Sequence, residues 1–150
     1  MRSLYTLLAS LIFATLAPAP AAARHRVAPV GQYVGVEVID RDTGRIAPVY
    51  AHDGQYWLAG TPGHRYAVRL RNLSGERVLA VLSVDGVNAV SGETASVQQA
   101  GYVLAPWQQT EVAGWRKSLH DIAQFEFTAL PDSYAARTGR PANVGVIGVA

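Results

Sequence analysis

The chain has 150 residues, no cysteine, a formal net charge of +2 and 16% charged residues. The absence of cysteine excludes disulfides, thiolate catalysis, iron–sulfur clusters and cysteine-ligated zinc. The small net charge argues against a nucleic-acid protein held by bulk electrostatic attraction. The remaining composition is apolar enough for a folded core and too varied for a low-complexity segment.

Residues 1–23 have the features of an export signal. A positively charged start precedes an uncharged run at residues 4–17, and small residues at 21–23 match the pattern that a signal peptidase cleaves. The alternative is a retained membrane anchor, but the uncharged run is shorter than the about 20 apolar residues that a spanning helix needs. We therefore expect cleavage before Arg24 and a periplasmic or secreted domain of residues 24–150, with no transmembrane segment.

Alternation of apolar and polar residues predicts short β-strands through most of the mature chain. Residues 33–39 place three valines on one face, and residues 65–71 place Tyr66, Val68 and Leu70 on one face. Residues 77–84 are apolar at nearly every position, which predicts a central strand covered on both faces. Further short strands are expected at residues 46–50, 56–59, 87–90, 102–104, 110–115, 125–129 and 144–149.

Turn residues separate these strands. Asp85-Gly86 between two apolar runs is a strong hairpin signal, because both residues of such a turn need positive φ. Pro48 should confine its strand to a sheet edge, because proline cannot donate a hydrogen bond to a neighbouring strand.

One short helix is expected at residues 118–124, where Ser118 would cap the first turn and Asp121 would take its third position. Together with eight or nine short strands, it predicts an all-β, single-domain β-sandwich of Ig-like or jelly-roll-like type.

No motif for catalysis or metal binding stands out in the sequence. The four histidines lack the spacing of a zinc site: His25, His52, His64 and His120. His52 and His64 nevertheless flank one predicted hairpin, so convergence in space stays open. Ser118, His120 and Asp121 are too close in sequence to form a catalytic triad on one helical turn. We therefore expect no cofactor and no metal, and we favour a non-enzymatic function.

An arginine stripe is predicted on one face of the strand at residues 65–71. Successive residues on one face of a strand stand about 7 Å apart, so Arg65, Arg69 and Arg71 could follow an anionic chain, such as an acidic envelope polysaccharide. The alternative is a solvated sheet face on which arginine stems cover apolar surface.

Five aromatic residues are candidates for a sugar-stacking platform: Tyr56, Trp57, Tyr102, Trp107 and Trp115. We expect Trp57 and Trp115 to belong to the core. Trp107 follows Pro106 at a predicted loop tip, where burial is harder to arrange. An exposed tryptophan at that position would be a contact residue.

Residues 131–141 form a long polar loop that carries Tyr134, Arg137 and Arg140. Long ordered loops in compact domains often serve function. Equally, Tyr134 could pack against the domain and Asp132 could pair with an arginine. The sequence leaves both interpretations open.

Four segments resemble a family of uncharacterised exported β-rich proteins of proteobacteria. They are the run beginning Arg-Asn-Leu-Ser-Gly-Glu-Arg-Val at Arg71, the segment Gly-Tyr-Val-Leu at Gly101, the segment Gly-Trp-Arg-Lys-Ser at Gly114, and residues 131–149. The resemblance covers a little over half of the chain. It implies export and a β-rich fold, and it transfers no activity or catalytic residue.

We therefore expect an exported, non-catalytic binding or interaction module of the bacterial cell envelope. It would hold a glycan or a protein partner, and not nucleic acid, through Trp107, Tyr134, Arg137 and Arg140. Two alternatives stay open. One is a hydrolase whose carboxylates or histidines converge only in the fold, and the other is a structural subunit that pairs its terminal or Pro48-containing edge strand with another chain. The oligomeric state is left open.

Overall fold

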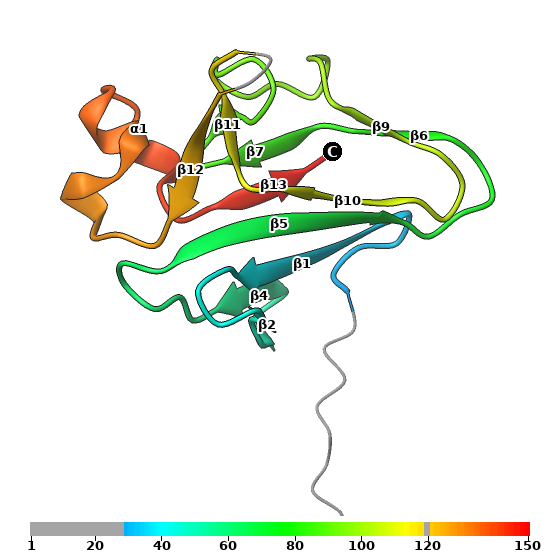
Figure 1. Cartoon of the computed structure of the whole chain (residues 1–150), viewed down its shortest axis with the longest axis horizontal. Coiled ribbons are helices and arrows are strands. Elements are labelled where there is room, and N and C mark those ends of the chain that lie inside the picture. The colour runs from blue at the N-terminus through cyan, green and yellow to red at the C-terminus, as the bar shows by residue number, and fades with distance from the viewer. Residues whose placement is uncertain (1–28, 119–120) are drawn as a thin grey trace, which may run out of the picture.

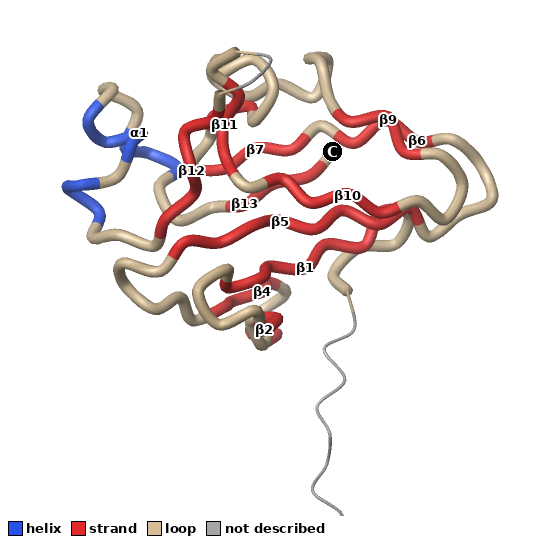
Figure 2. The backbone as a smooth tube through the Cα atoms, in the orientation of Figure 1, coloured by secondary structure: helices blue, strands red, loops and turns tan. Residues whose placement is uncertain are grey.

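The computed structural model describes residues 29–118 and 121–150, so the predicted export signal, His25 and His120 lie outside the described residues. Short antiparallel strands dominate the described part, which confirms the all-β prediction (Figures 1 and 2). No helix in this part is long and apolar enough to span a membrane. The strands are β1 (Val34–Asp40), β2 (Arg45–Ile46), β3 (Val49–His52), β4 (Gln55–Leu58), β5 (Arg65–Asn72), β6 (Val78–Ala80), β7 (Leu82–Val84), β8 (Val87–Asn88), β9 (Tyr102–Leu104), β10 (Gln109–Val112), β11 (Gly114–Arg116), β12 (Ile122–Glu126) and β13 (Ile147–Val149).

The largest sheet has the order β11-β12-β5-β1-β2, with β10 also paired to β5. Strand β5 is its centre: β1 pairs with one edge along the full length, while β10 and β12 share the other edge. A smaller sheet has the order β13-β7-β8, and β3–β4 and β6–β9 form two separate ladders.

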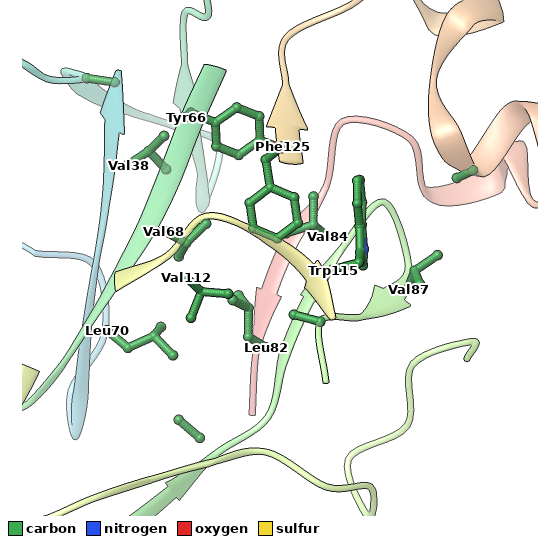
Figure 3. Packing of buried hydrophobic residues seen from close by; sticks show 14 of the residues in the cluster. Val38, Tyr66, Val68, Leu70, Leu82, Val84, Val87, Val112, Trp115 and Phe125 are labelled. Carbon is green, nitrogen blue, oxygen red and sulfur yellow. The ribbon is translucent and has the colours of Figure 1, made fainter. Parts of the chain in front are cut away.

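Side chains from the two sheets meet in one apolar core (Figure 3). The alternation predicted for β5 is confirmed, since Tyr66, Val68 and Leu70 all point into this core. Leu82 of β7 approaches them from the smaller sheet, and Phe125 of β12 is fully buried between them. Phe125 stacks on Tyr66 with a centroid separation of 5.3 Å, which adds to the free energy gained by burial. The two sheets are therefore the two layers of a sandwich.

The predicted hairpin between β7 and β8 is confirmed. Asp85 and Gly86 have φ values of 55° and 72°, as the two-residue turn requires. Asp53 and Gly54 make the same kind of turn between β3 and β4, with φ values of 49° and 73°.

The prediction of a helix at residues 118–124 is wrong. Ser118 and Asp121 instead close a turn between β11 and β12, in which the N–H of Asp121 donates to Ser118 Oγ at 3.0 Å. The hydrogen bond expected of a helix cap is present, but Trp115 pairs with Ala123 across the hairpin. A chain that continues directly into a paired strand satisfies its backbone groups through the sheet and has no room for a helix.

Among the described residues, the α-helical turn lies in the predicted polar loop. It is α1 (Tyr134–Arg137), flanked by the 3₁₀ turns η1 (Leu130–Asp132) and η2 (Pro141–Asn143). Ser133 caps α1, because its Oγ accepts the N–H of Ala136 at 3.1 Å.

The prediction of one central strand at residues 77–84 is half correct. The strand is interrupted at Val81, which exchanges backbone hydrogen bonds with Ala150. Leu82 in β7 is fully buried, whereas Leu79 in β6 is 54% exposed. Strand β6 pairs with β9 outside both main sheets, so one of its faces lacks a covering layer.

Candidate functional site

The predicted contact residues lie at two separate places. Trp107 is in the connection between β9 and β10, at one end of the long axis of the molecule. Tyr134 and Arg137 are in α1 at the opposite end, and Arg140 follows shortly after α1 (Figure 1). The structure therefore does not bring these four residues together into one site.

Trp107 is exposed, as predicted, with 63% of its surface accessible. Its φ of 61° lies in the left-handed region, which is unfavourable for a bulky residue. Its N–H donates to the carbonyl of Ser74 at 3.3 Å, and the Gln108 side chain accepts the N–H of Ala105 at 2.7 Å. These bonds hold Trp107 at the surface, and its role as a contact residue stays a prediction.

The residues of the predicted polar loop mostly serve packing. Tyr134 stacks on Trp115 with a centroid separation of 5.0 Å, and Ala135 is fully buried beside them. Arg140 Nη1 donates to the carbonyl of Gly92 at 3.4 Å. Arg137 is exposed at the end of α1. These contacts favour the structural interpretation of Tyr134 and Arg140.

The arginine stripe is largely neutralised by neighbouring carboxylates. Arg69 lies between Glu37 of β1 and Glu111 of β10 and donates to both, at 3.1 and 2.7 Å. Arg65 is ion-paired with Asp42. Two of the three arginines are thus occupied, which favours a solvated sheet face over a track for an anionic polymer.

Asp40, Asp42 and His64 offer ligand atoms that lie within 4.8 Å of one another, the spacing of a possible metal site. The Asp40 Oδ2 atom is hydrogen-bonded to His64 Nδ1 at 2.7 Å, and this bond lowers the pKa of the Asp40 carboxyl. Asp42 accepts the backbone N–H and the guanidinium of Arg65, and the side-chain hydrogen bond lowers the pKa of Asp42. A cation would compete with the Arg65 guanidinium at this position. The cluster links the turn after β1 to the loop before β5. The sequence does not indicate this contact, because Asp40 and His64 are 24 residues apart.

An apolar groove is a feature that the sequence did not predict. Its volume is about 660 Å³, within the range of about 300–1,000 Å³ that is typical of ligand sites. Its walls are the inner face of β1, the β3–β4 hairpin, β6 and the terminal strand β13, with residues 30–33 at the rim.

The lining of the groove carries no charged side chain. Gln32 supplies an amide, Tyr33 and Tyr56 supply hydroxyl groups and Trp57 supplies an indole N–H, whereas the remaining lining residues are aliphatic or glycine. Tyr33, Tyr56 and Trp57 remain exposed, at 67%, 63% and 56%. The expectation that Trp57 belongs to the core is therefore wrong, because its hairpin joins neither main sheet.

The groove exists because the two layers differ in width. The six-stranded sheet continues through β1 and β2, whereas the smaller sheet ends at β13. Val34 and Val36 of β1 consequently point inward but stay only half-buried, while Val38 is covered. Alternation in the sequence predicted that the valines of β1 share one face. Whether a second layer covers this face depends on where the smaller sheet ends, which the alternation does not indicate.

No protein-family model matches this chain, and neither the curated proteins nor the solved structures contain a significantly similar one. The architecture and the groove must therefore carry the functional interpretation by themselves.

Proposed function

We propose that this chain is an exported, non-catalytic binding module of the bacterial cell envelope, and that its ligand is a segment of another protein held in the apolar groove. The observation that carries the proposal is the groove itself, which has a volume of about 660 Å³, exposed aromatic side chains in its lining and no charged side chain. Exposed apolar surface of this kind is unfavourable in water and marks an interaction site.

The chemistry of the lining favours a protein segment over a glycan. A glycan site needs several fixed hydrogen-bond partners for sugar hydroxyls, and here the side chains offer one amide, two tyrosine hydroxyls and one indole N–H, on residues that are mostly exposed. Aliphatic walls instead match apolar amino-acid side chains, which gain about 25 cal/mol for each Å² removed from water.

The hydrolase alternative lacks support in the described part of the chain. No carboxylate, imidazole or basic side chain from that part lines the groove. Burial raises the pKa of Asp85, but this carboxylate accepts the N–H of Gly145 at 2.8 Å in the β7–β8 turn and does not reach the groove.

The experiment compares two variants with exposed apolar strand residues. Leu79→Arg places a charge in the groove, and Ile122→Arg places one on β12 outside the groove. The two positions are matched because Leu79 is 54% exposed and Ile122 is 47% exposed. We expect the purified chain and Ile122→Arg to bind the neutral dye Nile red and to retain the same envelope protein, and Leu79→Arg to lose both. Retention of a polysaccharide, or of material that is insensitive to Leu79→Arg, would contradict the proposal.

A further inference from the structure

We infer that the partner segment binds as an added β-strand along the outer edge of β13. This inference rests on the proposed function, because it specifies how a protein segment would be held in the groove. It also specifies which strand would pair with another chain, a possibility that the sequence left open for the terminal edge strand.

Strand β13 is an edge strand within the described part of the chain, since its sheet has the order β13-β7-β8. Ala150, just after β13, exchanges both backbone hydrogen bonds with Val81. In an antiparallel pair, backbone groups alternate between facing the neighbour and facing away from it. The N–H and C=O groups of Ile147 and Val149 therefore point to the side away from β7, where an incoming strand would lie.

The side chains of β13 have the matching alternation. Ile147 and Val149 line the groove. Gly148 faces the other way, where an added Cβ would lie 2.8 Å from Ser83 Oγ. A strand beside β13 would repeat this pattern and direct every second side chain into the groove, toward Val34 and Val36 on the opposite wall.

The added strand would occupy the place where the smaller layer is too narrow. It would continue the sheet β13-β7-β8 across the uncovered inner face of β1. This is the geometry of strand addition, in which main-chain hydrogen bonds give affinity and alternate side-chain pockets give specificity.

The edge of β13 also differs from the outer edges of the large sheet. Natural proteins protect exposed edges with charges and prolines. Strand β2 carries Arg45 and is followed by Pro48, and β11 ends at Arg116. Strand β13 consists of isoleucine, glycine and valine, and none of the described residues that line the groove beside it has a charged side chain. The partner segment should therefore be uncharged on its inward face.

The test uses a fluorescently labelled ten-residue peptide in which valine and threonine alternate between terminal lysines. Its control has the same side chains but carries N-methyl groups on the four central residues, which removes the donors that strand pairing needs. We expect the unmodified peptide to bind the full chain and Ile122→Arg equally. Binding should be at least about tenfold weaker for Leu79→Arg and for the N-methylated peptide with the full chain. Circular dichroism would confirm that both variants fold.

Three outcomes would overturn the inference, and they differ in whether the proposed function survives. Equal affinity for the N-methylated peptide would mean that the groove holds apolar segments without strand pairing, so the proposed function would survive. A self-association measured by light scattering that Leu79→Arg abolishes would make a second copy the occupant. Failure of the peptide, Nile red and envelope capture together would contradict both the inference and the proposed function.

Discussion

The two halves of the sandwich are built from the same kinds of residue, yet only one half is closed. In the closed half, between β5, β10 and β12 on one side and β7 and β8 on the other, Phe125 and Leu82 are fully buried. In the open half, formed by β1, the β3–β4 hairpin, β6 and β13, Tyr56 and Leu79 remain 63% and 54% exposed. The difference lies in whether a second layer covers the apolar face, and the uncovered half is the one in which we propose that a partner binds.

The same contrast appears between two neighbouring strands. Val36 on β1 and Val68 on β5 both belong to alternating apolar faces that point inward. Val68 is fully buried, but Val36 is only half-buried, because β1 lies beyond the edge of the smaller sheet. An apolar face at the rim of a sandwich can therefore serve stability in one half and recognition in the other.

The largest expected effect is the difference in the free energy of unfolding lost when an aromatic side chain is removed from the closed half and from the open half. Phe125→Ala should lower the free energy of unfolding by about 3–5 kcal/mol, because it leaves a cavity in a closed core. Tyr56→Ala in the open half should lower it by less than about 1 kcal/mol. Urea unfolding of both variants measures the difference. Similar losses at the two positions would show that the open half is as tightly closed as the core.

A second expected effect concerns the attachment of the separate two-stranded ladder of β6 and β9, here called the β6–β9 arm, to the closed half. Buried Asn72 at the end of β5 donates through Nδ2 to the carbonyls of Glu76 and Ala105, at 2.6 and 2.9 Å. Asn72→Asp replaces this donor by an acceptor, which should cost about 2–3 kcal/mol. Urea unfolding would detect it, and a stability equal to that of the unaltered chain would mean that the arm is not anchored there.

A smaller effect is expected on the outer face of the closed half. Arg69→Met removes the bridge between Glu37 and Glu111 and should cost about 1 kcal/mol or less at low salt. The cost should shrink at high ionic strength because salt screens partly exposed charges. Arg71→Met is the matched control, since no described carboxylate pairs with Arg71, and it should change stability little. Equal effects for the two variants would contradict the assigned pairing.

The smallest effect concerns pH. The hydrogen bond from His64 keeps the pKa of Asp40 below its ordinary value, so this bond stabilises the folded chain at neutral pH. Its contribution is lost as the pH falls through that lowered pKa. The urea midpoints of the unaltered chain and Asp40→Asn should therefore differ at pH 7 and converge in acid, once the pH lies below the lowered pKa of Asp40. Asp132→Asn, at an exposed carboxyl, serves as the control; a difference that persists at low pH would contradict this role for the Asp40–His64 contact.

Local patterns in the sequence were sufficient for part of the structure. Alternation identified β1 and β5, and Asp85-Gly86 identified a hairpin, because both depend on neighbours in the chain. The prediction of a helix at residues 118–124 was wrong, because a turn with Ser118 as its cap has the same local sequence pattern whether a helix or a strand follows.

The candidate site could not be predicted in the same way. Tyr56 and Trp57 were recognised as aromatic candidates, but their partners in the groove lie more than 80 residues away, in β13. The long polar loop predicts Tyr134 as a contact residue together with Trp107, although stacking on Trp115 holds it at the other end of the molecule. Only the order and width of the sheets reveal which apolar face stays uncovered.

The three tryptophans permit the most direct test of the claim that the open half binds the ligand. Trp57 lines the groove, Trp107 lies on the β9–β10 connection and Trp115 belongs to the core. Their indole N–H signals should be followed by ¹⁵N NMR while the neutral amphiphile octyl glucoside is added below its micelle concentration. We expect the Trp57 signal to shift in a saturable manner while those of Trp107 and Trp115 stay in place. A shift confined to Trp107 or Trp115, or no shift at all, would contradict the account.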